Sequence, residues 1–208
     1  MEKTITSSFC ATIEEKKSKF IAYAYPISSE EDVKAHIQQL KKEHFKARHH
    51  CSAYRINQKG CLVEHSSDDG EPSGTAGRPM LEVLRHEQVN NILVVVVRYF
   101  GGIKLGTGGL ARAYSQATKE VLNEAVYQVQ KVQKVYQVIS PYTIYDSLVY
   151  FLNQNHLYFD DLQYSDVIQF KLYIDDNQKN IMQLLQEQFL QLTILDVGEK
   201  EVFLPYND

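Results

Sequence analysis

Residues 92–122 read ILVVVVRYFGGIKLGTGGLARAYSQATKEVL, and this stretch decides the fold of the first part of the chain. Its aliphatic run from Ile92 to Val97 predicts a strand that is buried on both faces. A glycine-rich loop, Gly101 to Gly109, follows, and the apolar residues from Leu110 to Leu122 then recur at helical spacing. A buried strand, a tight loop and an amphipathic helix therefore succeed one another here.

The residues before this stretch predict a mixture of strands and helices. Aromatic and β-branched runs indicate strands, and a capping serine followed by acidic residues indicates the start of a helix. The expected elements are a strand at 20–25, a helix from a Ser28 or Ser29 cap to about His44, paired strands at 51–56 and 61–65, and a short helix that starts near Pro79. Residues 68–79 between them have the Gly, Pro, Asp and Ser content of a turn.

The residues after position 130 differ in chemistry from those before. Residues 136–208 hold three basic and eleven acidic side chains, a net charge of −8, whereas residues 1–135 hold nineteen basic and fifteen acidic, a net of +4. Periodicity in the second part predicts β-α-β-β-α-β, the ferredoxin-like order. We therefore expect an α+β protein with domains at 1–130 and 136–208.

Composition narrows the class of protein. The 208 residues are 44% hydrophobic and 23% charged, which is typical of a globular chain. Six aliphatic residues form the longest such run, far short of the roughly 20 that a membrane helix needs. Three cysteines without a CxxC pair, and a start without a secretory signal, predict a cytoplasmic protein with free thiols and no membrane partner.

The glycine-rich loop is the first candidate site. It opens a helix, and backbone N–H groups at a helix start favour an anion, although these glycines could equally serve only tight turns and close packing. The spacing matches neither a Walker loop nor GxGxxG. The candidate anion-binding residues are Arg78, Arg98, Gly101, Gly102, Lys104, Gly106, Gly108, Gly109 and Arg112.

The turn that contains Asp68, Asp69 and Glu71 is the second candidate. Such a set of carboxylates suits magnesium or acid–base catalysis, but acids in a Gly-Pro turn more often cap a loop or pair with arginine. His50 next to Cys51 resembles a base beside a nucleophile, yet adjacent strand residues point to opposite faces. We assign no catalytic residue, no metal site and no cofactor from these patterns.

Aromatic and basic residues form a third set. Tyr54, Tyr99 and Phe100 could stack on bases, or they could belong to a core. A positive face is indicated by Lys41, Lys42, Lys46, Arg48 and Arg55. The negative second part argues against a nucleic-acid footprint over the whole chain, so any phosphate contact should fall on the first part.

Three segments resemble the IMPACT/YigZ family, in its bacterial two-domain form. They are His49-His50-Cys51 with Ala53-Tyr54-Arg55, SSDDGEPSGTAGRP at Ser66–Pro79, and VVVVRYFGGIKLGTGGLARAYS at Val94–Ser115. The resemblance implies a first domain of the ribosomal-protein βαβ type, like the fourth domain of elongation factor G, and a ferredoxin-like second domain. Eukaryotic relatives regulate translation but carry a different partner domain.

The resemblance and the residues together predict a non-catalytic regulatory protein linked to translation. It would bind RNA, the ribosome or a translation-associated protein through the glycine-rich, basic face of the first domain. A phosphate-linked or metal-assisted hydrolase that uses Asp68, Asp69 and Glu71 is one alternative. A docking module that contacts only protein is the other.

Overall fold

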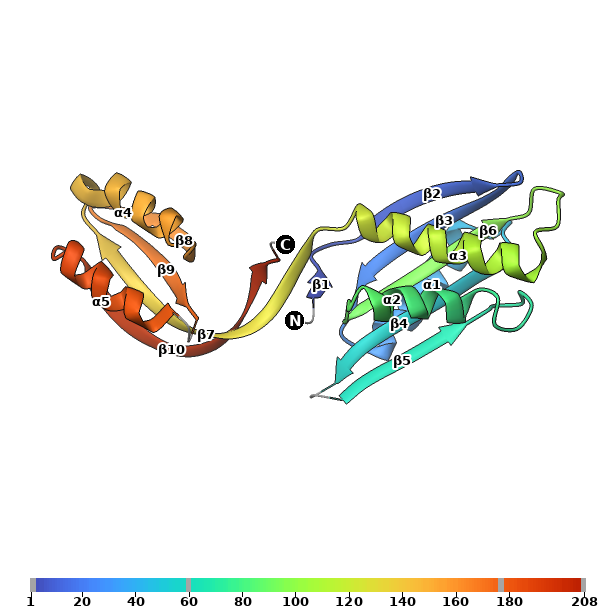
Figure 1. Ribbon diagram of the computed structural model, residues 1–208, viewed down its shortest axis with the longest axis horizontal. Coiled ribbons are helices and arrows are strands. Elements are labelled where there is room, and N and C mark those ends of the chain that lie inside the picture. The colour runs from blue at the N-terminus through green and yellow to red at the C-terminus, as the bar shows by residue number, and fades with distance from the viewer. Residues whose placement is uncertain (1–2, 59–60, 176–177, 207–208) are drawn as a thin grey trace. The chain divides into compact units, whose positions relative to one another are not determined.

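The computed structural model describes residues 3–58, 61–175 and 178–206, and the chain divides into two compact units (Figure 1). One unit takes in the chain up to Val129 and from Pro205 on, and the other spans Gln130–Leu204. Two antiparallel sheets and, in the described residues, five helices make the protein mixed α+β. This class is the predicted one.

The sheet of the first unit has β6 at its centre. Its strand order is β2 (Phe9–Glu15), β3 (Ser18–Pro26), β6 (Ile92–Tyr99), β4 (His49–Gln58) and β5 (Cys61–Ser67). Both β3 and β4 pair antiparallel with β6, so they run parallel to each other on either side of it. Helix α1 (Glu30–Glu43) makes the crossover between β3 and β4, and Ser29 caps it in a capping box with Asp32.

Helices cover both faces of this sheet. Helices α2 (Gly77–His86) and α3 (Gly106–Asn123) lie on one face (Figure 1), where Val94 and Val96 pack with the α3 residue Tyr114. On the other face, Val95 and Val97 pack in one cluster with residues of α1. The central strand is apolar at consecutive positions because alternate side chains enter two different cores. The prediction of a strand buried on both faces is therefore confirmed.

Two strands at the start of the chain were not predicted from the sequence. Strand β2 is an edge strand that pairs with β3, and its Phe9, Ala11 and Ile13 pack against the α2–α3 core while the residues between them face outward. Strand β1 (Lys3–Ile5) pairs with the first residues of β7 (Tyr127–Ser140), with Lys3 opposite Val129. The alternation in β2 is the period-2 signal of a half-buried strand.

The second unit has the element order β-α-β-β-α-β that the sequence predicts. After β7 come α4 (Tyr142–Gln154), β8 (Tyr158–Tyr164), β9 (Ile168–Ile174), α5 (Lys179–Gln188) and β10 (Thr193–Pro205). Strand β9 lies between β7 and β8, and β10 pairs with β7. Val138 and Phe170 of the sheet pack with Leu148 of α4 and Leu185 of α5.

None of the helices in the described residues combines the length and the apolar character that a membrane-spanning helix needs.

Candidate anion-binding site

The glycine-rich loop between β6 and α3 passes close to the turn between β2 and β3. A Cβ atom on Gly101 would lie 2.0 Å from the carbonyl carbon of Lys17, so no larger residue fits there without a shift of the backbone. The Gly101 N–H donates to Ser18 Oγ at 3.2 Å, which ties the loop to the turn. Gly106 has φ +71°, a left-handed conformation that glycine adopts without strain, and the chain enters α3 at this residue.

The start of α3 carries no side-chain cap. Leu105 occupies the N-cap position, and its side chain accepts no hydrogen bond from the first turn. Gly106, Thr107 and Gly108 are exposed. The first N–H groups of a helix lack partners within the helix and lie at the positive end of its dipole. The loop therefore presents free backbone donors on the surface, a geometry that suits an anion.

A cavity of about 760 Å³ opens beside the start of α3, and its lining is rich in cations; we call it the cationic cavity. Its lining combines four parts of the chain: the residues up to the start of β4, the turn after β5, the end of β6, and the glycine-rich loop with the start of α3. The lining residues are Lys46, Arg48, His49, Glu71, Pro72, Arg98, Tyr99, Phe100, Lys104, Leu105, Gly106, Thr107 and Leu110. Strand pairing brings these segments together, since His49 of β4 lies opposite Arg98 of β6. Glu71 is the only acidic residue among them.

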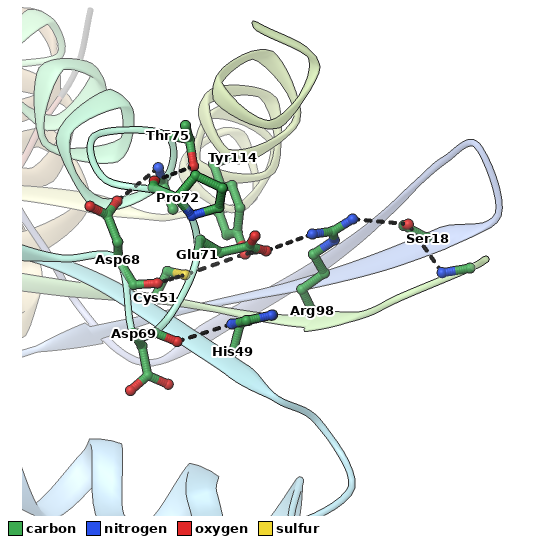
Figure 2. Close-up of polar contacts among 12 residues, drawn as sticks. Ser18, His49, Cys51, Asp68, Asp69, Glu71, Pro72, Thr75, Arg98 and Tyr114 are labelled. Atoms are coloured by element: carbon green, nitrogen blue, oxygen red, sulfur yellow. Dashed lines mark hydrogen bonds and ion pairs between the residues drawn. The ribbon is translucent and has the colours of Figure 1, made fainter. Parts of the chain in front are cut away.

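Glu71 and Arg98 form a buried ion pair in the wall of this cavity (Figure 2). Arg98 Nη1 donates to Glu71 Oε1 at 2.7 Å, and the two side chains are 7% and 4% exposed. The Tyr114 hydroxyl donates to the same oxygen at 2.9 Å, and Arg98 Nη2 lies 3.5 Å from Ser18 Oγ. The charge of Glu71 is thus neutralised, and the exposed cations of the cavity face no free carboxylate of its lining.

Cys51 and His50 lie on opposite faces of the sheet, as predicted. The Cys51 thiol lies 2.9 Å from the Asp68 carbonyl oxygen and 3.3 Å from the Tyr114 hydroxyl. Burial raises the pKa of this thiol to about 12, so it stays protonated near neutral pH and is a poor nucleophile. His50 is buried on the α1 side, and burial lowers its pKa. The three cysteines are free thiols.

Asp68 serves as a distant cap for α2. Its Oδ2 accepts from the Gly74 N–H at 2.7 Å, and its Oδ1 accepts from Ala76 and Gly77 at 3.0 and 2.9 Å. Burial by itself would raise the pKa of this carboxyl, but the three N–H donors outweigh it and lower the pKa. This carboxylate satisfies the first donors of a helix, a structural role that the turn chemistry allowed.

Asp69 anchors the same turn to α1 and β4. Its Oδ1 lies 2.9 Å from Lys41 Nζ, and its Oδ2 accepts from the His50 N–H at 2.7 Å. Its carbonyl oxygen is 3.0 Å from His49 Nδ1 (Figure 2). All three acids of the turn therefore have partners inside the protein. In residues 3–58, 61–175 and 178–206, no three His, Cys, Asp or Glu side chains are grouped as a metal site would need.

The structure separates the predicted anion-binding residues. Lys104 and Gly106 line the cationic cavity, whereas Gly109 and Arg112 line a second cavity of about 670 Å³ beside β2. Gly101, Gly102 and Gly108 lie in the glycine-rich loop and the first turn of α3 without lining the cationic cavity. Arg78 is exposed on α2 and lines neither cavity, and Arg98 is the buried partner of Glu71.

Two residues of the predicted basic and aromatic set are buried instead. Tyr54 is 8% exposed, and its hydroxyl donates to Glu30 at 3.0 Å, so its ring is not free to stack on a base. Arg55 is also 8% exposed and pairs with Glu64, so it contributes no cation to the surface. Both lie in the middle of β4, where helices cover each face of the sheet.

The sequence did not identify His49, Pro72 or Thr107 as residues of the site. It indicated Lys46 and Arg48 as basic, and Phe100 as an aromatic that could stack, but it did not place them together. The signal that could have found them is strand register. A β4 that begins at His49 and pairs with β6 brings residues 46–49 beside the glycine-rich loop.

The fold and the cavity define a two-unit α+β protein with a cationic surface cavity at the end of its central strand. The family model of the Impact N-terminal domain matches residues 16–122. The IMPACT family member YvyE of Bacillus subtilis (strain 168) is 38% identical over 165 residues, which cover 79% of this chain and 76% of YvyE. The chain belongs to the IMPACT family, as the sequence motifs predicted.

Two solved structures are also similar. A protein described only as hypothetical is 30% identical, covers 96% of this chain and 100% of its own, and superposes with a TM-score of 0.60. Yih1, described as a two-domain translational regulator, is 30% identical; the match covers 59% of this chain and 47% of Yih1, with a TM-score of 0.35.

Proposed function

We propose that this protein is a non-catalytic regulator linked to translation, and that it binds RNA, free or within the ribosome, through the cationic cavity and the glycine-rich loop. One observation carries the proposal: exposed cations surround an uncapped helix start in a cavity whose only acid is neutralised internally. Phosphate is the anion that such a surface suits best, because backbone N–H groups and basic side chains both bind it.

The distribution of charge supports a nucleic acid as the partner. Lys46, Arg48 and Lys104 lie on the cavity, are exposed, and have no ion pair among the described residues. The net charge of +4 for residues 1–135 has the same sign. Binding that uses these cations should weaken steeply with salt, because each phosphate contact releases counterions.

The geometry does not favour the hydrolase alternative. Asp68 is taken up by backbone donors, Asp69 by Lys41 and a backbone N–H, and Glu71 by Arg98 and Tyr114. A general base needs a free lone pair within reach of the substrate. The three carboxylates therefore have structural roles, as a helix cap or as partners of basic and backbone groups.

Family membership supports the link to translation. Yih1, which is 30% identical to this chain where the two match, is described as a translational regulator. We further assign the first unit to the ribosomal-protein βαβ type, with a boundary near residue 130, and the second unit at 136–208 to the ferredoxin-like type. The free cysteines agree with a cytoplasmic location.

A salt series tests the proposal. Fluorescently labelled single-stranded RNA and purified ribosomes are titrated or co-sedimented with the wild type, with Lys46→Ala, Arg48→Ala and Lys104→Ala, and with the triple variant. Lys34→Ala, an exposed lysine of α1 away from the cavity, is the matched control. Each cavity variant should weaken binding and reduce the slope of log K against log salt by about 0.7, while the control leaves both unchanged.

Two results would count against this function. Unchanged affinity in the triple variant would remove the cavity from the interface. A ribosome complex that survives nuclease treatment and responds little to salt would instead favour the protein-docking alternative.

A further inference from the structure

We infer that the cationic cavity holds one unpaired nucleotide of an RNA strand, with its phosphate at the start of α3 and its base against Phe100. This inference rests on the proposed function and deepens it, because it specifies the form of RNA that the site accepts. It combines three observations: a phosphate position, an exposed aromatic ring and a histidine nitrogen that is free to accept a hydrogen bond.

The phosphate position is defined by donors on several sides. Gly106 and Thr107 bring the uncapped start of α3 into the cavity lining, and Lys104 stands beside them. Arg98 adds a second, independent observation: its side chain is 7% exposed and lines the cavity. Its Nε hydrogen has no acceptor among the residues that the structure describes. An unpaired buried donor carries a free-energy cost that an anionic oxygen relieves.

Phe100 supplies a surface for the base. It is 58% exposed although it is a large apolar side chain, and it lines the cavity. The Arg98 guanidinium carbon lies 5.5 Å from the centre of its ring, which fixes a cation next to the aromatic face. Pro72 and Leu105 extend the apolar lining. Bases stack on aromatic rings of this kind in proteins that bind single strands.

His49 offers a group that distinguishes ribose from deoxyribose. Its Nδ1 is 3.0 Å from the Asp69 carbonyl oxygen, and a carbonyl only accepts, so the proton of the neutral ring is on Nδ1. The other nitrogen, Nε2, is then an acceptor, and it points away from Asp69 (Figure 2). Because His49 lines the cavity, this nitrogen can accept a hydrogen bond from a 2′-hydroxyl.

The form of the cavity favours a splayed nucleotide over a duplex. Its volume of about 760 Å³ lies within the range of pockets that enclose small ligands. In a duplex the bases are stacked inside the helix, so none of them reaches Phe100 while a phosphate occupies the start of α3. A base that is already unpaired enters without the cost of unstacking.

Fluorescence anisotropy with four probes tests the inference. The probes are an unstructured RNA 10-mer, the same RNA as a duplex, the DNA of the same sequence, and labelled uridine monophosphate. Phe100→Ala is compared with Phe203→Ala, a control in the second unit whose phenylalanine is similarly exposed at 51%. Phe100→Tyr retains the ring, and His49→Phe removes the acceptor nitrogen.

Single-stranded RNA should bind most tightly. Phe100→Ala should weaken its binding by about 5- to 140-fold without changing the salt slope, whereas Phe100→Tyr and Phe203→Ala keep the wild-type affinity. His49→Phe should bring the affinities for RNA and DNA together.

Different failures are distinguishable. Equal binding of single strand and duplex, with Phe100→Ala neutral, would overturn the nucleotide pocket and leave RNA binding through the phosphate backbone intact. If uridine monophosphate bound as tightly as the 10-mer, the ligand would be a free nucleotide and not a nucleotide within an RNA strand. Absence of RNA binding at low salt would overturn the proposed function itself.

Discussion

Removal of the Glu71 carboxylate should destabilise the first unit strongly, because it leaves the Arg98 guanidinium buried without its charged partner. Glu71 is the only acid that contacts Arg98 in the described part of the chain, at 2.7 Å, and both side chains are more than nine-tenths buried. In Glu71→Ala the guanidinium would keep no carboxylate partner in the described part of the chain, only a 3.5 Å contact to Ser18 Oγ and the neighbouring rings of Phe20 and Phe100. Breaking a buried ion pair from one side costs about 3–5 kcal/mol, because the remaining charge stays buried without compensation.

Two further variants separate charge from packing. Glu71→Gln retains an oxygen acceptor for Tyr114 and removes the charge, so we expect a smaller cost of about 1.5–3 kcal/mol. The double variant Glu71→Leu with Arg98→Met replaces the pair by apolar side chains. It should recover most of the loss, since such replacements are often close to neutral.

Urea unfolding followed by far-UV circular dichroism measures these differences, and amide hydrogen exchange in peptides of β6 assigns them to the first unit. The second readout is needed because the chain has two units and no tryptophan to report on either. A loss below about 1 kcal/mol in Glu71→Ala would refute the reasoning. So would a double variant that is no more stable than Glu71→Ala.

Three other changes probe the supports of the site. Asp68→Asn should lose about 1 kcal/mol of stability at pH 7. Because the fold lowers the Asp68 pKa, the wild type is more stable than the variant at pH values above the ordinary pKa of 3.8, and this difference disappears as the pH falls through the pKa of the folded state. Urea titrations that give the same difference in free energy of unfolding at pH 7 and pH 3 would contradict this. Burial lowers the His50 pKa, despite Asp69 nearby, so the free energy of unfolding should fall as the pH drops below 6.5, the ordinary pKa of histidine. His50→Gln should flatten that part of the stability profile, and a profile unchanged in the variant would show that His50 is not its cause. Gly101→Ala places a methyl group against the Lys17 backbone and should cost about 1–3 kcal/mol, visible as a lower midpoint in thermal unfolding; an unchanged midpoint would mean that the loop yields freely.

Local pattern predicted most of the fold. The run Ile92–Val97, the helical spacing after Leu110 and the turn residues at 68–79 each specify their structure within a few neighbours. The structure has a strand and a helix at the first two places, and a loop at 68–76, because α2 begins at Gly77, two residues before the expected start near Pro79. Strand β2 was not predicted because its apolar residues, Phe9, Ala11 and Ile13, alternate with others over only seven residues at the edge of the sheet. Strand β1 has three residues and depends on its pairing with β7, which no local pattern encodes.

The candidate site was less accessible from sequence because charge and aromaticity do not reveal burial. Arg55, Arg98 and Tyr54 have the composition of a ligand surface, but the sheet places all three inside, each with an acidic partner. The acids of the turn show the same ambiguity. Asp68 could be recognised as a cap only once the first turn of α2 was positioned nine residues later.

Strand register resolves this ambiguity and sets the number of cations that remain for a ligand. The pairing of His49 with Arg98 brings Lys46 and Arg48 beside Lys104, although 56 positions separate Arg48 from Lys104 in the sequence. Arg98 is neutralised by Glu71, and Lys41 is paired with Asp69, so neither adds to the free charge of the cavity. Three lysine and arginine side chains are left, and for single strands each contributes about 0.7 to the salt dependence. The expected slope of log K against log salt is therefore about −2, well below the value that a count of the basic residues in this part of the sequence would suggest.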